Sequence, residues 1–303
     1  TPFWDKAAHA DRQPFLAGRS RILRAVRAWF EAEGFTEVEP AMLAPCPGAE
    51  THIDAFEADG RYLHTSPEFA MKKLLAAGEE KIFFLGKCWR RGEEGPLHAP
   101  EFTMLEWYRA HAPYERAMDD CVAIARTAAR ASGADALRWR DKSCDPFTAA
   151  ERLTVRQAFA ELAPIEPPQD GDAFSAALVR HIEPNLGEGA LTLLTEYPLR
   201  EAALARRAPH DPNVAERFEM YACGVELANG FGELTDPVEQ RRRLVEAMDE
   251  KQRRYGKSWP IDEDFLSALA HMPRASGVAL GFDRLVMLAT GARHIRDVLW
   301  TPA

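Results

Sequence analysis

Charged and aromatic side chains gather in residues 89–108, where a strand-like stretch, a polar loop and a second strand-like stretch follow one another. Arg90 ends the first stretch, while His98 and Phe102 flank the start of the second. A guanidinium binds phosphate or carboxylate, and an aromatic ring can stack on a nucleotide base. These three side chains therefore predict a nucleotide-binding surface; the alternative interpretation is a solvated hairpin tip.

Glu106 and Tyr108 lie on the second stretch and point to the face that also holds Met104. An unpaired buried charge is energetically unfavourable, so a carboxylate on such a face is expected to have a binding partner or a function. We therefore expect Glu106 and Tyr108 to belong to a polar pocket.

A second group of carboxylates lies in residues 216–234, where two strand-like stretches meet at Gly224. Glu219 and Glu226 stand on either side of this turn, and paired carboxylates can hold Mg²⁺ against the phosphates of a nucleotide. An amide, a ring and a carboxylate then share one face because they alternate along the strand, and they suit a cationic ligand: Asn229, Phe231 and Glu233. The alternative is an exposed polar face of an edge strand.

A third segment, residues 276–285, has the pattern of a strand that ends at Gly281 and a helix with Arg284 in its first turn. Helix N-termini attract anions through their unpaired N–H groups, and an arginine adds a full positive charge. The spacing of the glycines is common, so this segment alone is a weak signal. Beside the other two segments it predicts an additional anion-binding position.

The elements that must position these side chains follow from the hydrophobic pattern. Helices are expected at residues 15–33, 67–77, 113–133, 237–254 and 282–290, with two shorter ones within 153–186. Strands are expected at residues 35–39, 52–56, 61–65, 81–90, 102–109, 191–197, 216–222, 225–234 and 276–280. Strands that return after helices predict an α+β fold, an antiparallel β-sheet flanked by helices. We expect residues 1–303 to form a single domain with a helical excursion at about 113–190.

Composition narrows the class of protein. The chain of 303 residues is 46% hydrophobic and carries a formal net charge of -9, which lowers the expectation of a nucleic-acid partner. Its five cysteines form no C-x-x-C pair, which suits a reducing compartment and argues against a disulfide framework or a zinc site. We find no signal peptide and no apolar run near the roughly 18 residues that span a bilayer. The sequence therefore predicts a cytoplasmic protein that does not bind membranes.

Taken together, the three segments resemble the motifs of class II aminoacyl-tRNA synthetases, and specifically the lysine branch. The helix and strand before Pro40 resemble motif 1, Arg90 to Tyr108 resembles motif 2, and Gly277 to Arg284 resembles motif 3. The most specific part is the string His98-x-Pro-Glu-Phe-Thr-Met-x-Glu-x-Tyr108, and the likeness extends from about residue 15 to the end. The resemblance implies the catalytic core of this family.

Within that branch the chain is most similar to the short paralogues that attach β-lysine to a lysine of elongation factor P. No anticodon-binding barrel precedes the motif 1 helix in this sequence, so an acceptor other than tRNA is expected. Ser66 stands where lysyl-tRNA enzymes usually carry alanine, and Ala279 stands where they usually carry glycine. Both differences would reshape the pocket around the reacting end of the substrate.

The resemblance also implies roles for single residues. Arg90 would grip the substrate carboxylate or the α-phosphate, Arg284 would meet the γ-phosphate, and these two would be the catalytic pair. The amino acid would contact Ser66, Glu68, Glu106, Tyr108, Asn229, Phe231, Glu233 and Ala279. Glu68 would bind the amine near the reacting end, and Glu233 with Tyr108 would bind the distal ammonium. ATP would contact Arg90, Glu93, His98, Phe102, Glu219 and Arg284, and Mg²⁺ would lie on Glu219 and Glu226.

The chain departs from the family at one position, because Gly92 replaces the usual motif 2 glutamate. Glu93, one residue later, is the candidate to take over its contact with adenine. ATP and Mg²⁺ are the implied cofactors, a small amino acid and elongation factor P are the implied partners, and motif 1 implies a homodimer. Two alternatives remain open: a lysine-activating enzyme for a tRNA or small-molecule acceptor, and a ligand-binding paralogue without catalysis.

Overall fold

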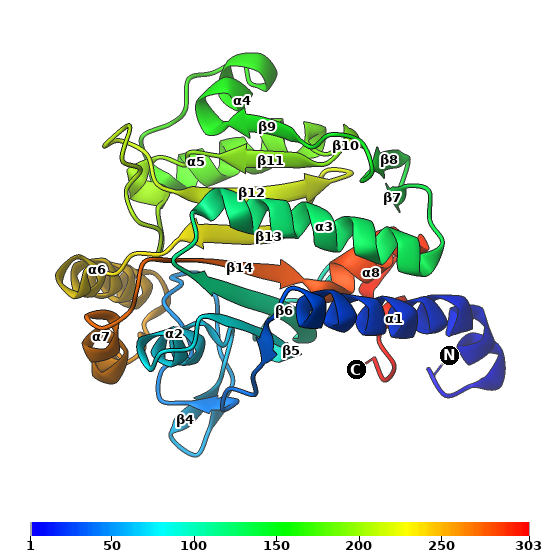
Figure 1. Cartoon of the computed structure of the whole chain (residues 1–303), viewed down its shortest axis with the longest axis horizontal. Helices are drawn as coiled ribbons and strands as arrows, with labels where there is room; N and C mark the ends of the chain where they lie inside the picture. The colour runs from blue at the N-terminus through cyan, green and yellow to red at the C-terminus, as the bar shows by residue number, and fades with distance from the viewer. Residues whose placement is uncertain (1, 303) are drawn as a thin grey trace.

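The computed structural model describes residues 2–302, and its centre is an eight-stranded sheet (Figure 1). In spatial order the strands are β1 (Thr36–Glu37), β5 (Lys81–Trp89), β6 (Glu101–Ala110), β14 (Ala275–Gly281), β13 (Val225–Gly232), β12 (Arg217–Ala222), β11 (Thr192–Thr195) and β9 (Glu151–Thr154). Neighbouring strands from β5 to β11 are antiparallel, whereas β1 pairs with β5 and β9 pairs with β11 in parallel. The expected α+β fold with a mainly antiparallel sheet is therefore confirmed.

One face of the sheet packs against α1 (Lys6–Ala32), α3 (Tyr114–Ser132) and α8 (Phe282–Thr290), which also contact one another (Figure 1). Alternation along the strands supplies the apolar side chains of this face, such as Leu105 and Trp107 from β6. Phe30 of α1 stacks on Phe83 of β5 with 4.4 Å between ring centroids. We call this side the helix face, and it holds the largest core cluster within residues 2–302.

The opposite face of the sheet is more polar, and we call it the pocket face. It is bordered by α2 (Glu68–Ala76), which contacts β6 and α7 (Glu263–Leu269); α7 in turn packs on α6 (Pro237–Tyr255). A small sheet of β2 (Leu43–Ala44), β4 (Arg61–Leu63) and β3 (Glu57–Ala58) lies beside α2. The remaining elements are α4 (Val155–Leu162), α5 (Gly171–Ala177), α9 (Ile295–Val298), β7 (Leu137–Trp139), β8 (Lys142–Asp145) and β10 (Gly189–Ala190), with a π-helical turn at Leu178–Ile182 and short 3₁₀ turns at Glu183–Asn185 and Leu199–Glu201.

The structure differs from the sequence-based expectation in three places. The first helix begins at Lys6 rather than near residue 15, because the Asp5 carboxylate caps it by accepting from the amides of Ala7 and Ala8. Residues 52–56 form no strand and make only an isolated bridge, Asp54 to Arg91. The segment 113–190 is not purely helical, since it contains β7, β8 and β9, and β9 joins the main sheet.

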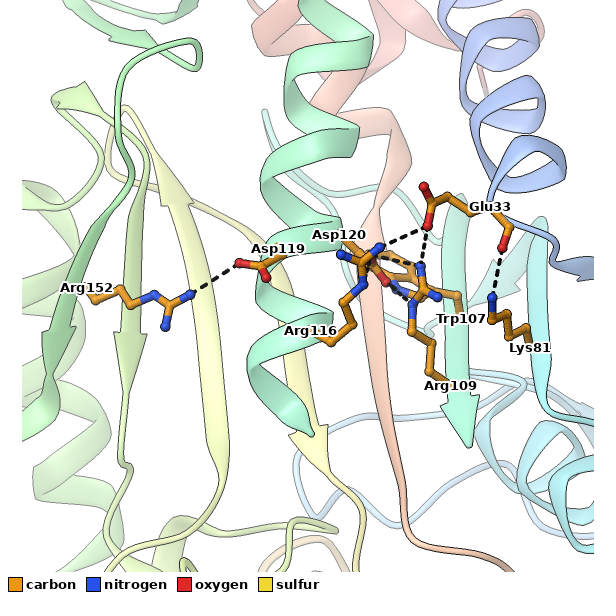
Figure 2. A network of polar contacts seen from close by, with 8 residues as sticks. All are labelled: Glu33, Lys81, Trp107, Arg109, Arg116, Asp119, Asp120 and Arg152. Atoms are coloured by element: carbon orange, nitrogen blue, oxygen red, sulfur yellow. Dashed lines mark hydrogen bonds and ion pairs between the residues drawn. The ribbon is translucent and has the colours of Figure 1, made fainter. Parts of the chain in front are cut away.

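A buried polar network ties the helix face together (Figure 2). The Arg109 guanidinium on β6 donates to both carboxylate oxygens of Asp120 on α3, at 2.7 and 3.0 Å. The Trp107 indole also donates to Asp120, and Arg109 reaches Glu33 after α1. The network therefore links three elements that are distant in sequence.

Two further properties bear on the class of protein. Within residues 2–302, no helix combines the length and apolar character that crossing a bilayer requires. All five cysteines are buried and carry free thiols.

Candidate active site

The floor of the pocket that holds the expected site residues is formed by three adjacent strands of the pocket face. Two rows of residues run across β13, β14 and β6: Asn229–Ala279–Glu106 and Phe231–Gly277–Tyr108. In both rows the residue of the central strand is small, so a hollow forms between the larger side chains on either side. A Cβ added to Gly277 would come within 2.3 Å of the Tyr108 ring and 2.5 Å of Glu233 Oε1. Glycine at this position is therefore what allows Tyr108 and Glu233 to approach one another.

Glu106 lies at the centre of a hydrogen-bonded group at one end of the pocket. The hydroxyls of Ser66 and Tyr108 each donate to one of its oxygens at 2.7 Å. Burial, reinforced by the nearby charge of Glu68, raises the pKa of Glu106 to about 8, so its carboxyl holds a proton at neutral pH. The Ser66 hydroxyl also accepts from the Glu68 amide at 3.1 Å, which joins this group to the start of α2.

Two further carboxylates at this end share one cation. Lys72 Nζ lies 2.6 Å from Glu68 Oε1 and 2.6 Å from Glu233 Oε2. Burial raises the pKa of Glu233 to about 7, although the Lys72 ammonium opposes that rise. Burial likewise raises the pKa of Glu68, again against the attraction of Lys72. This end of the pocket therefore holds three carboxyl groups, and each of them already contacts a hydroxyl or the Lys72 ammonium.

The other end of the pocket is cationic and is formed around Arg90. Its guanidinium lies over the Phe102 ring at 5.1 Å and 3.9 Å from the Glu93 carboxylate. The Arg90 backbone amide donates to Pro100 O at 2.9 Å, which fixes the residue at the base of the loop. Its Nε is buried and has no hydrogen-bond partner among the described residues, so it can still donate to a ligand.

Arg284 approaches the same end from the first turn of α8. It donates to Leu97 O and Glu226 O, and its NH2 lies 2.7 Å from His98 Nε2. Because a guanidinium can only donate, His98 must accept through Nε2 and carry its proton on Nδ1. Burial and the charge of Arg284 both lower the pKa of His98, which favours this neutral ring.

The two carboxylates expected to hold Mg²⁺ differ in their placement. Glu226 lines the pocket, because an extra residue in β13 between the pairs Met220–Ala228 and Tyr221–Glu226 breaks the strand alternation there. Glu219 lies outside the lining, and its oxygens already accept from Arg217 and from the hydroxyls of Tyr197 and Tyr221. In the part of the chain that is described, no three metal-binding side chains form a cation site.

Every other site residue expected from the sequence lines one pocket. These are Ser66, Glu68, Arg90, Glu93, His98, Phe102, Glu106, Tyr108, Glu226, Asn229, Phe231, Glu233, Ala279 and Arg284. The chemistry that this arrangement permits is the binding of a cationic amine at one end and of anionic groups at the other.

Sequence reasoning missed three residues at the pocket or directly behind it. Lys72 falls in a helix where lysines are ordinary, and only its burial distinguishes it. Glu50 and Ile53 line the pocket from a segment that was expected to be a strand from residue 52. That segment is held by Lys251 of α6, whose ammonium donates to the carbonyls of Thr51 and Ile53. A lone lysine in a charged helix gave no signal of this contact.

Comparison with known proteins gives a consistent result. A sequence model of the family "tRNA synthetases class II (D, K and N)" matches residues 4–303. A protein of Yersinia enterocolitica named elongation factor P--(R)-beta-lysine ligase is 37% identical, over 95% of this chain and 94% of the relative. Proteins of the same name from Enterobacter sp. and Hamiltonella defensa are each 36% identical, over 99% and 95% of this chain and 97% and 94% of their own lengths.

Proposed function

Because this chain belongs to the class II tRNA synthetase family of the D, K and N branch, we propose that it activates a lysine-like amino acid with ATP and transfers it to a lysine side chain of elongation factor P. The observation that carries the proposal is the pocket itself, with carboxylates at one end and two arginines at the other. Its relatives over nearly their full lengths carry the name of that ligase. (R)-β-Lysine is the amino acid that this name specifies.

The acidic end would recognise the amino groups of the substrate. Glu233 and Tyr108 would contact the distal ammonium, and Glu68 would contact the amine near the reacting end. Glu106 would act as a neutral hydrogen-bonding group held by Ser66, because its pKa of about 8 keeps a proton on it. Asn229, whose side-chain amide donates through Nδ2, would orient the carboxylate. Phe231 and Ala279 would shape the walls between these contacts.

The cationic end fits the phosphates and the base of a nucleotide. Arg90 offers an unpartnered Nε, Phe102 offers a ring, and Arg284 adds a second guanidinium. His98 would support Arg284, and Glu93 is the candidate contact for adenine. Bound Mg²⁺ would neutralise phosphate charge. Glu226 fits that ion as a pocket carboxylate, whereas Glu219 would first have to release the donors that now occupy its oxygens.

Positioning and charge neutralisation would carry the chemistry. In the first step a carboxylate oxygen of the amino acid attacks the α-phosphorus of ATP, the bond to the β-phosphate oxygen breaks, and pyrophosphate leaves. Arg90 would neutralise the attacked phosphate, and Arg284 the departing one. In the second step a neutral lysine amine of the protein acceptor attacks the acyl carbon, the bond from that carbon to the phosphate oxygen breaks, and AMP leaves, with its own phosphate as the candidate acceptor of the amine proton. The five free thiols suit a reducing cytoplasm, and α1 would supply the interface of a homodimer.

Intact-mass measurement tests this proposal. The protein is incubated with ATP, Mg²⁺, (R)-β-lysine and unmodified elongation factor P, and parallel reactions use α-lysine or unmodified tRNA. We expect the factor to gain one lysyl unit with (R)-β-lysine, and to gain none without ATP or with Glu233→Gln. Pyrophosphate exchange without any gain in mass would leave activation standing and refute the protein acceptor. Charging of tRNA would support the alternative acceptor instead.

A further inference from the structure

Lys72 lies beneath the acidic end of the pocket and belongs to no role assigned so far. It is the fifth residue of α2, and only 1% of its surface is exposed. Its ammonium bridges Glu68, one turn earlier on the same helix, and Glu233, which follows β13, at 2.6 Å each. One internal cation thus joins two pocket carboxylates that are far apart in sequence.

Burying the charged ammonium of Lys72 costs desolvation free energy, so its presence requires an explanation. Burial by itself would lower the pKa of this ammonium, but the attraction of Glu233 and Glu68 outweighs burial and raises it. Replacing a buried ion pair by apolar side chains is often neutral or stabilising, so packing alone does not explain a lysine here. A charged group at this position is better explained by what it does to the two carboxylates.

Each of the two carboxylates keeps one oxygen that Lys72 does not contact. Glu233 Oε1 accepts no hydrogen bond from any residue in 2–302 and lies beside Gly277, at the floor of the pocket. Glu68 lines the same pocket and uses Oε1 for Lys72. When both carboxylates are ionised, the single cation leaves one negative charge unbalanced, and each carboxylate keeps one free oxygen.

We propose that Lys72 is a positioning residue that favours the ionised forms of Glu68 and Glu233 and fixes both carboxylates, each with one oxygen left for an amino group, so that the pocket selects an acid carrying two amino groups. The inference rests on the function proposed above and adds the origin of its substrate selectivity. Lys72 itself contacts no substrate in this arrangement. It acts through the two carboxylates.

No neighbouring group replaces Lys72 in this task. Among the described residues, Glu106 and Tyr108 on β6 and Glu50 before β3 also act on these carboxylates, and none of these three is a cation. Arg206 acts on Glu233, but its guanidinium is paired with Glu216. Loss of the Lys72 charge should therefore raise the pKa values of Glu68 and Glu233 and leave them protonated at pH 7.

Calorimetric binding of amino acids without ATP tests the proposal, with Lys72→Met as the variant. The probes are (R)-β-lysine and α-lysine, which carry two amino groups, and 6-aminohexanoate, which carries one. We expect Lys72→Met to weaken binding of the two diamino acids at least 30-fold at pH 7 and to remove most of the preference over 6-aminohexanoate. Affinity should recover between pH 7 and pH 9 as the carboxyls ionise. An unchanged affinity, within threefold of the natural protein, would overturn the proposal.

Lys73→Met is the matched control, because Lys73 is the next residue of α2 and pairs with Asp262 and Asp264 instead. It should leave affinity and pH dependence unchanged. If Lys72→Met does not fold, Lys72→Gln keeps N–H donors without the charge and should show the same loss, whereas Lys72→Arg should restore part of the binding. Equal binding by the Gln and Arg variants would refute a role for the charge.

The affinity for ATP separates positioning from a purely structural role. Lys72→Met should change ATP affinity less than threefold, whereas a general distortion of the pocket would weaken ATP and amino acid together and would overturn the proposal. If the natural protein bound no diamino acid, the proposed function would fail and this inference with it. Normal binding by the natural protein together with normal binding by Lys72→Met would refute this inference alone.

Discussion

Burial gives Glu106 a different charge from that of a glutamate in water, and this makes the stability of the protein depend on pH. Its pKa of about 8 in the folded chain exceeds the unfolded value of about 4.3, so the folded state binds more protons between these limits. The free energy of unfolding should therefore fall as the pH rises through this window. Glu106→Gln, which is neutral at all pH values, should reduce the fall between pH 5 and pH 8 by roughly 2–4 kcal/mol.

Urea titrations at several pH values measure this effect. Glu79→Gln, at an exposed position, is the control and should leave the pH dependence unchanged. An equally steep fall in the Glu106→Gln variant would show that Glu106 is ionised in the folded protein.

Gly277 tests the close contact at the floor of the pocket. A methyl group there would lie 2.3 Å from the Tyr108 ring and 2.5 Å from Glu233 Oε1, and both are held in a packed layer. Gly277→Ala should cost about 1–3 kcal/mol of stability and weaken amino acid binding at least tenfold, while ATP affinity changes little. Gly95→Ala, where the nearest atom is 3.9 Å away, should bind normally. Thermal melts and calorimetry would check both; normal amino acid binding by Gly277→Ala contradicts the prediction.

At the scale of single residues, the sequence revealed the groups whose types are unusual for their positions. Glu106 and Glu233 were found because carboxylates on strands stand out. Lys72 was missed because its partners come from a turn of its own helix and from a strand that is distant in sequence. The pairing of Glu219 was missed because it depends on donors from Arg217, Tyr197 and Tyr221, and the pattern of residue types does not show that these side chains meet it.

At the scale of elements, α3 is joined to the sheet by the pair Arg109 and Asp120 shown in Figure 2. Asp120→Ala would leave the Arg109 Nε and the Trp107 indole without their acceptor, with Glu33 still accepting from Arg109 NH2, and should cost about 3–5 kcal/mol of unfolding free energy. Asp119, the preceding residue, pairs with Arg152 at an exposed position. Asp119→Ala should therefore cost at most about 1 kcal/mol. Urea titration compares the two, and equal losses would contradict the prediction.

Elements with strong local signals were predicted well, and those that depend on distant partners were not. The helix at 113–133 is observed as Tyr114–Ser132, and Gly133 ends it with a φ of 79°. The short strand β9 was missed because it pairs only with β11, about forty residues later in the chain. The local residue pattern does not indicate this pairing. Residues 151–154 are therefore a strand because of their tertiary pairing and not because of their local sequence.

At the scale of the whole molecule, Arg19 connects the first helix to both sides of the nucleotide end. Its buried guanidinium donates to Asp283, next to Arg284, and to the Thr103 hydroxyl at 2.8 Å, next to Phe102. The Thr103 amide in turn donates to Asp283 at 2.7 Å. These contacts set the positions of two segments that line the pocket.

Arg19→Met should therefore lower both stability and nucleotide affinity. The loss of one partner of a buried pair should cost about 3–5 kcal/mol of unfolding free energy. We expect the affinity for ATP to fall at least fivefold, with a smaller change for the amino acid. Arg27→Met, which breaks an exposed pair with Glu37, should change neither by a measurable amount. Urea titration and calorimetry distinguish these outcomes, and an unaltered ATP affinity in Arg19→Met would show that the linkage has no effect on the site.

The position of β14 between β6 and β13 has a consequence for the order in which the protein is made. The pocket floor needs residues 275–281 to pair with residues 104–110, far earlier in the chain. Pairings between such distant segments form slowly, because closing the long loop costs entropy before the new contacts can stabilise it. A nascent chain that has not yet released β14 from the ribosome therefore has no pocket, and ligand binding arises only after residues 275–281 have emerged and paired.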